Sequence, residues 1–206
     1  ATPNGTTVFA LTDTAGAALD GGPTQLSDPT PHFQLWRSDD QGAHWQRTGP
    51  LPAPMIYSMR AVNKPGGGQA MIYLQGIDPH AKDPRAGVLG YLYASTDGGQ
   101  RWTKAPDTDL PPARIGSVGL ATVLPDGEVV ATNFTADGTT PPWDLYAWKP
   151  GERQWRQLTT GLLGIGGVYT VRFIPAGPGG PAALWMFYDM DGQAWESVAA
   201  ITLAGV

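Results

Sequence analysis

The chain has 206 residues, of which 28 are glycine, 20 are proline and eight are tryptophan, and its formal net charge is −5. A hydrophobic content of 41% without any cysteine indicates a folded, turn-rich all-β protein that has no disulfides and no thiolate metal sites. The negative charge excludes an electrostatic footprint for nucleic acid, and no apolar run approaches the ~18 residues of a membrane span, so membrane insertion is not expected.

The first residue is Ala1 rather than methionine, and the opening residues 1–5 are typical of a linker or of the end of a stalk. No signal peptide is visible. The absence of cysteine fits an exported bacterial protein. We therefore expect the mature form, or an excised domain, of an extracellular or cell-surface protein.

One eight-residue pattern, Ser-x-Asp-x-Gly-x-x-Trp, occurs twice, at residues 38–45 and 95–102. Its fixed positions are Ser38, Asp40, Gly42 and Trp45 in the first copy, and Ser95, Asp97, Gly99 and Trp102 in the second. The pattern predicts a hairpin turn whose Asp carboxylate accepts hydrogen bonds from free N–H groups of the loop. The Gly is expected to supply a positive φ. We expect the Trp to open the next strand and to bury its ring beneath the turn.

This repeated pattern resembles the Asp box, or BNR repeat, of the sialidase-like and sortilin-like superfamily and of the photosystem II assembly propellers. The resemblance implies a β-propeller. It does not imply an enzyme, because the Asp boxes of that family are structural turns placed away from the catalytic face.

The repeat spacing supports the same fold, because the tryptophans at positions 45, 102 and 155 lie roughly 50 residues apart, which suits one four-stranded blade per repeat. We expect a single domain over 1–206, or a fragment of a larger ring, with blades at about 6–50, 51–107, 112–160 and 165–206. The third blade contains a degenerate Asp box at 149–155, which keeps the Gly and the Trp but lacks the Ser and the Asp.

Alternation and turn residues predict strands in every blade and no helix. The expected strands, in chain order, are 6–12, 32–38 and 44–48; 55–62, 69–76, 88–95 and one from 101; 115–123, 128–134, 143–149 and 154–159; 168–174, 182–188 and 193–203. The first blade thus lacks an inner strand and the last lacks an outer strand. Open edges and apolar faces are normally covered, so we expect self-association, or a neighbouring protein segment, to complete the ring.

The connections divide into two classes. Short, Gly-rich turns join inner and outer strand pairs at the Asp-box face. Long loops are expected on the opposite face, at 13–31, 48–54, 77–87, 105–114, 135–142 and 160–167. Since long loops on a rigid scaffold commonly carry function, we expect the functional face to lie opposite the Asp boxes.

Several loop residues could carry chemistry. His80, beside Asp78 and Asp83, could ligate a metal or transfer a proton, or it could simply be an exposed loop residue. Asp189 and Asp191 lie in one tight turn and could bind calcium, but a calcium site needs six to eight converging oxygens. The alternative is that these carboxylates are solvated turn residues. We expect no cofactor and leave the metal open.

Two arginines are the sharper candidates, because Arg60 and Arg172 align in the inner strands of the second and fourth blades, with Gly119 at the matching place of the third. Such a pair could grip a carboxylate in the central channel, as the three arginines of sialidases do. The alternative is that each pairs with a neighbouring carboxylate or carbonyl. Only three glutamates are present, and no Tyr–Glu nucleophile pair can be placed, so we assign no catalytic residues.

Four tryptophans could line a sugar-binding groove or pack between blades: Trp36, Trp143, Trp148 and Trp185. Trp143 is the best candidate for exposure, because prolines and Asp144 flank it. The sequence thus predicts a non-catalytic extracellular binding or interaction module for a protein or carbohydrate ligand. The alternative is a sialidase-type glycoside hydrolase, or a fragment of one.

Overall fold

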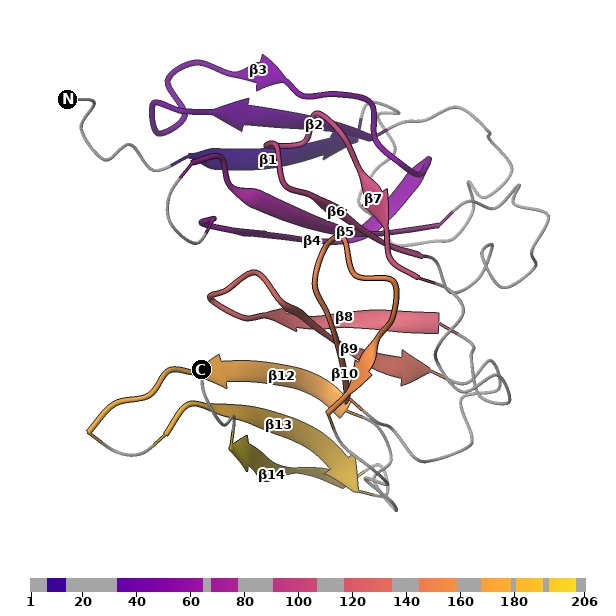
Figure 1. The fold of residues 1–206 in the computed structure, drawn as a ribbon, viewed down its shortest axis with the longest axis vertical. Helices are drawn as coiled ribbons and strands as arrows, with labels where there is room; N and C mark the ends of the chain where they lie inside the picture. The colour runs from indigo at the N-terminus through magenta and orange to yellow at the C-terminus, as the bar shows by residue number, and fades with distance from the viewer. Residues whose placement is uncertain are drawn as a thin grey trace. The chain divides into compact units, whose positions relative to one another are not determined.

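The structure is a computed structural model. It describes residues 7–13, 33–64, 68–77, 91–106, 117–134, 145–158, 168–178, 181–190 and 193–202. The regular structure in these ranges consists of fourteen β-strands in four antiparallel sheets (Figure 1). The described residues contain no helix, and so none with the length and apolar character that crossing a membrane would require. The all-β class predicted from the sequence is confirmed.

Each sheet is a meander in which every strand pairs with the strand before it in the chain. The first sheet contains β1 (Val8–Asp13), β2 (Phe33–Ser38) and β3 (Gln46–Arg47). The second contains β4 (Met55–Val62), β5 (Met71–Ile77), β6 (Tyr91–Ser95) and β7 (Thr103–Lys104). The third contains β8 (Ser117–Val123), β9 (Val129–Phe134), β10 (Leu145–Trp148) and β11 (Arg156–Gln157). The last contains β12 (Val168–Ile174), β13 (Ala183–Met190) and β14 (Gln193–Thr202).

The outer strands are shorter than the sequence suggests. β3, β7 and β11 have two residues each, and both residues of each strand are exposed. A short edge strand offers few unpaired backbone groups to another chain, which is a common protection against edge-to-edge association. The edges formed by these three strands therefore offer little backbone for pairing with another chain.

The chain forms two compact units, Ala1–Ala105 and Pro106–Val206, with two sheets in each. In the first unit, Leu35 of β2 joins Ile56, Ile72 and Leu74 of the second sheet in one buried cluster. Phe9 of β1 packs against this cluster. Face-to-face contact between neighbouring sheets thus forms the core of the unit, as expected when each sheet has apolar side chains on both faces.

Candidate functional site

The two Ser–Asp turns, at residues 38–45 and 95–102, have the geometry that the sequence predicts. Ser38 Oγ donates to Asp40 Oδ1 at 2.7 Å and accepts the N–H of Gly42 at 2.8 Å. Asp40 Oδ1 in turn accepts the N–H of His44 at 2.8 Å. Gly42 has a φ of 97°, which an L side chain rarely adopts. The carboxylate and the glycine therefore close the turn together.

The second turn repeats these bonds. Ser95 Oγ donates to Asp97 Oδ1 at 2.8 Å. Asp97 Oδ1 also accepts the N–H groups of Gln100 and Arg101 at 3.1 and 2.9 Å. Burial raises the pKa of Asp97, but the bonds from Arg101, Ser95 and Gln100 lower it by more, so the net shift is downward. The hydrogen bonds from His44 and Ser38 likewise hold the pKa of Asp40 below its usual range. Both carboxylates are occupied within their own turns, which supports a structural role.

The tryptophans that end these turns differ in burial, which corrects one expectation. Trp102 packs against the cluster that contains Leu35 of the preceding sheet. Trp155, at the same position of the third sheet, is 7% exposed, and its Nε1 donates to the carbonyl of Pro106 at 2.9 Å. Trp45 is 41% exposed, so the prediction that its ring is buried is wrong. Trp102 and Trp155 are covered by parts of the chain that precede them. No described element precedes the first sheet to cover Trp45 in the same way.

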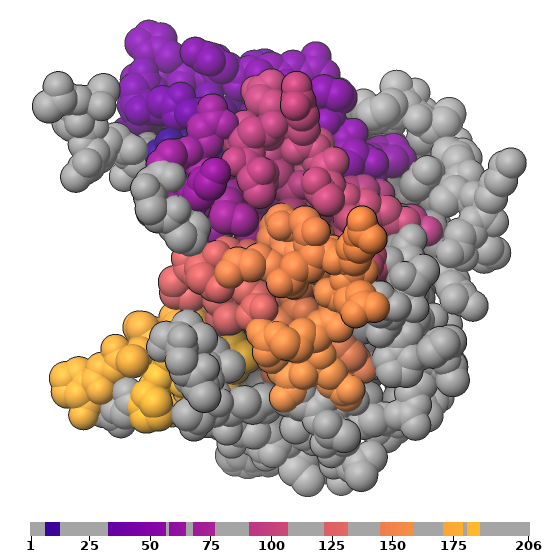
Figure 2. All heavy atoms as spheres, in the orientation of Figure 1, coloured from indigo at the N-terminus to yellow at the C-terminus, as the bar shows by residue number. Residues whose placement is uncertain are grey.

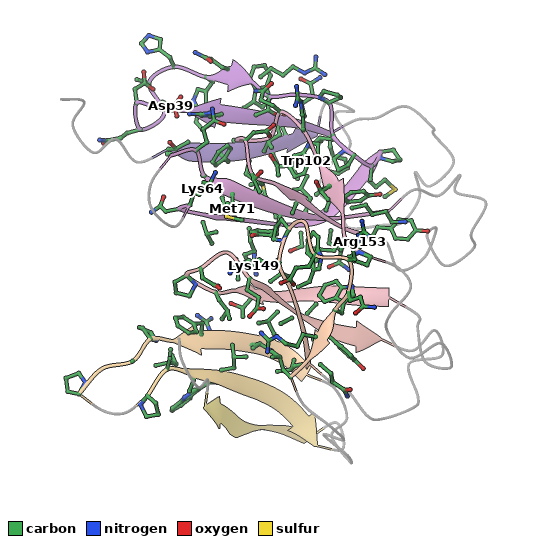
Figure 3. The ribbon with its side chains drawn as sticks, in the orientation of Figure 1. Asp39, Lys64, Met71, Trp102, Lys149 and Arg153 are labelled. Atoms are coloured by element: carbon green, nitrogen blue, oxygen red, sulfur yellow. The ribbon has the colours of Figure 1, made fainter. Side chains whose placement is uncertain are left out.

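The turn of the third sheet uses other side chains. Glu152 accepts the N–H of Lys149 at 3.1 Å and its carbonyl accepts Trp148 Nε1 at 3.1 Å, so the missing Ser and Asp are replaced. Lys149, which lies with Arg153 on this turn (Figure 3), pairs with Asp126 at 2.7 Å. Asp126 belongs to the turn between β8 and β9. The short turns therefore lie at one end of this sheet, as predicted, and Lys149 and Asp126 pair across them.

Arg60 and Arg172 occupy the same position of their sheets. Arg60 pairs across the strands with Tyr73, and Arg172 with Trp185. A bulge leaves one residue of each inner strand unpaired, and the arginine lies three residues after that unpaired residue. Both arginines are exposed. Arg60 Nη1 donates to the carbonyl of its neighbour Met59 at 3.1 Å, and neither arginine forms an ion pair with a described carboxylate.

The third sheet has Thr122, not Gly119, at this position. Thr122 pairs with Val130 and Val130 with Ala147, just as Arg60 pairs with Tyr73 and Tyr73 with Ala94. The bulge of β8 lies between Leu120 and Thr122, closer to the turn than the bulge of β4, and this shifts the alignment. The match with Gly119 made from the sequence is therefore wrong.

We call one strand-register position the forward position, because in the first unit its side chain faces the following sheet. Four residues occupy it, one in each sheet. In the first sheet it is Phe9, which packs against the buried cluster that Leu35 forms with the second sheet. The strand registers place Tyr73 and Val130 at the same position, and both are fully buried. In the last sheet the forward position is Trp185, which is 41% exposed.

Trp185 belongs to an exposed patch on the last sheet, which we call the forward face and define by Arg172, Ile174 and Trp185. Ile174 is 42% exposed, and Arg172 is the cross-strand neighbour of Trp185. The end of β12 and the residues after it, yellow in Figure 2, lie at the molecular surface. The opposite face of this sheet is buried, because Val171 and Leu184 are 4% and 0% exposed.

Among the described residues, the exposed large apolar side chains are Trp45, Ile174 and Trp185. All three belong to the first and last sheets. Trp36 is half-buried and Trp148 is fully buried. Ile174 was missed by the sequence analysis, although its alternation with Arg172 placed it on the same face of the strand as that arginine.

The loop candidates lie outside the described residues or have undescribed side chains. His80, Trp143 and Asp191 fall outside, and Asp189 is described only as part of β13, where it pairs with Glu196. Among the described residues, no group of three or more histidines and carboxylates could hold a metal ion. The proposed calcium and proton-transfer sites stay predictions.

Comparison with known proteins identifies the fold. No family model and no curated protein matches the chain. A crystal structure of an ancestral GH74 enzyme matches with a TM-score of 0.51 and 18% identity, covering 84% of this chain and 21% of that chain. The chain has a β-propeller fold. It spans about a fifth of that GH74 enzyme.

Two further propellers match less well. YCF48 bound to D1 peptide has a TM-score of 0.39 and 18% identity, covering 76% of this chain and 40% of that chain. The α-L-arabinofuranosidase Arb93A from Fusarium graminearum, in complex with an iminosugar inhibitor, has a TM-score of 0.41 and 14% identity, covering 74% and 47%.

Proposed function

We propose that this chain is a non-catalytic, extracellular propeller module of the Asp-box type, which binds another protein through the forward face of its last sheet. One observation carries the proposal. Trp185 is 41% exposed at a position where Tyr73 and Val130 are fully buried. Exposed apolar patches of this kind mark interaction sites, and a tryptophan beside an arginine is the composition found at the centre of protein interfaces.

The energy available at this face is substantial. A tryptophan buries about 150–250 Å² when fully covered, so covering the exposed 41% of Trp185 removes roughly 60–100 Å² from water. At ~25 cal/mol per Å² this contributes about 2 kcal/mol. Ile174, which is 42% exposed, adds a similar fraction of its smaller surface. Binding through such a face needs no metal or other cofactor.

A sialidase-type glycoside hydrolase is the alternative, and the described residues favour it less. A sialidase would present three arginines to the substrate carboxylate, and the third sheet has Thr122 where the others have Arg60 and Arg172. Arg60 also donates to the neighbouring carbonyl of Met59. A carbohydrate that stacks on Trp185 would be a non-catalytic variant of the same proposal.

Hydrolysis of a fluorogenic sialoside across the pH range tests the absence of catalysis. We expect no turnover above the rate of the heat-denatured chain, because the described inner strands supply two matched arginines rather than three. Turnover that disappears in both Arg60→Ala and Arg172→Ala would establish the hydrolase instead. Thr122→Ala is the matched control, since it changes the third inner strand without removing a charge.

A further inference from the structure

The first unit contains a complete contact between two successive sheets. Phe9 and Leu35, from the first sheet, meet Ile72 and Leu74 of the second, and Tyr93 and Trp102 complete the cluster from the second sheet. The segment after β3 also contacts the second turn, because Gly49 N donates to the carbonyl of Gly99 at 3.1 Å. Within the first unit, the forward side chain Phe9 of one sheet and the tyrosine and tryptophan of the following sheet therefore pack against the same buried cluster.

The first sheet has the following half of this contact, without a partner sheet for it among the described residues. By strand register, Trp36 and Trp45 stand where the second sheet has Tyr93 and Trp102, since Trp36 pairs with Arg47 as Tyr93 pairs with Lys104. Trp36 is half-buried and Trp45 is 41% exposed. Two indole rings are thus available on the face of the first sheet opposite Leu35. This face corresponds to the face of the second sheet that meets Leu35.

The last sheet has the preceding half of the contact. Trp185 holds the forward position that Phe9 holds in the first sheet, and Arg172 and Ile174 lie on the same face. Phe9 packs against the buried cluster that Leu35 forms with the second sheet, whereas Trp185 and Ile174 remain 41% and 42% exposed. The chain therefore exposes both halves of a contact that it makes internally.

We propose that a second copy of this chain covers the forward face of the last sheet, and that its first sheet makes the contact through Trp36 and Trp45. This inference rests on the proposed function, because it names the protein partner of the same face. The contact joins different surfaces of the two copies. Contacts of this kind link copies in series, and they close into a ring when the rotation between copies allows it.

The second copy fits better than an unrelated partner because the required surface is already present in this sequence. A propeller sheet buries its two faces against neighbouring sheets. The first sheet has aromatic side chains, Trp36 and Trp45, at the register positions of Tyr93 and Trp102, which pack against the same cluster as Phe9 within the first unit.

Two single variants, studied by sedimentation velocity over a range of concentrations, test the contact. Trp45→Glu places a charge on the first sheet and Trp185→Glu places one on the last sheet. Both rings are 41% exposed, so each substitution introduces its charge at the surface of its sheet. We expect the wild type to sediment as more than one chain and each variant alone to sediment as a monomer. An equal mixture of the variants is expected to form a two-chain species, because each retains the surface that the other has lost.

Three results would overturn the proposal: a monomeric wild type at every concentration, variants that still assemble alone, or a mixture that stays monomeric. If circular dichroism shows that either variant is unfolded, Trp45→Ala with Ile174→Glu replaces the pair and carries the same expectation. A monomeric wild type without sialoside turnover rejects only the second copy as partner. Turnover lost with the arginines rejects the binding module and leaves the assembly result intact.

Discussion

Removing the carboxylate of Asp97 should destabilise the chain without affecting binding. Asp97 Oδ1 accepts three hydrogen bonds, from Ser95 Oγ at 2.8 Å, from Gln100 N at 3.1 Å and from Arg101 N at 2.9 Å. A net hydrogen bond contributes about 0.5–1.5 kcal/mol. The Gln100 and Arg101 N–H groups lie on exposed residues and can regain water, whereas Ser95 is 1% exposed. We therefore expect Asp97→Ala to lower the free energy of unfolding by about 1–3 kcal/mol.

Urea denaturation followed by tryptophan fluorescence measures this loss. Thr96→Ala is the matched control, because Thr96 is the exposed neighbour in the same turn, and we expect it to change the free energy of unfolding by less than about 0.5 kcal/mol. If Asp97→Ala unfolds at the same urea concentration as the wild type, the turn does not depend on the carboxylate and the structural role assigned to the repeat is wrong.

The same variant should have a characteristic pH dependence. The net pKa of Asp97 is lowered from its ordinary value of 3.8, so its charged form stabilises the folded state above that value. This contribution is lost as the pH falls through the lowered pKa. The difference in unfolding free energy between wild type and Asp97→Ala should therefore be constant near neutral pH and shrink in acid. A difference that grows in acid would contradict the assigned direction of the shift.

Three further predictions concern packing, charge and metal. Gly49→Ala should lower the free energy of unfolding by about 1–3 kcal/mol, because the added Cβ would lie 2.5 Å from the Gln100 carbonyl oxygen. In Gly177→Ala, the control, the added Cβ meets nothing within 4 Å, so this variant should be neutral in thermal melts. Arg156→Ala removes the 2.7 Å pair with Glu128, and its cost in urea denaturation should stay below about 1 kcal/mol, because the arginine is 60% exposed. A chelator should leave the melting temperature unchanged, and a calcium-dependent rise would instead establish a metal site.

Local patterns predicted the fold well because strands and turns are encoded locally. Alternating side chains and the Gly-containing turns identified the strands, and the Ser38 and Asp40 spacing gave the hydrogen bonds of the turn. Features that depend on neighbouring sheets were not accessible in this way. The exposure of Trp45 reflects what lies against the first sheet, and the Gly119 alignment failed because a bulge shifts the register. Ile174 could be recognised as an exposed residue only once the burial of both faces of the last sheet was known.

Cross-linking between copies tests the central claim, that the first sheet of one copy covers the last sheet of another. The chain has no cysteine, so single cysteines can be placed at the exposed residues Arg47, the cross-strand neighbour of Trp36, and Ala176, after Ile174. Treated with a short bis-maleimide, a mixture of Arg47→Cys and Ala176→Cys should give a cross-linked pair that contains one of each variant, and neither variant should cross-link alone. The control mixture pairs Arg47→Cys with Gln154→Cys, on the exposed turn of the third sheet, and should not react. Equal cross-linking in the control mixture, or none in the test mixture, would contradict the claim.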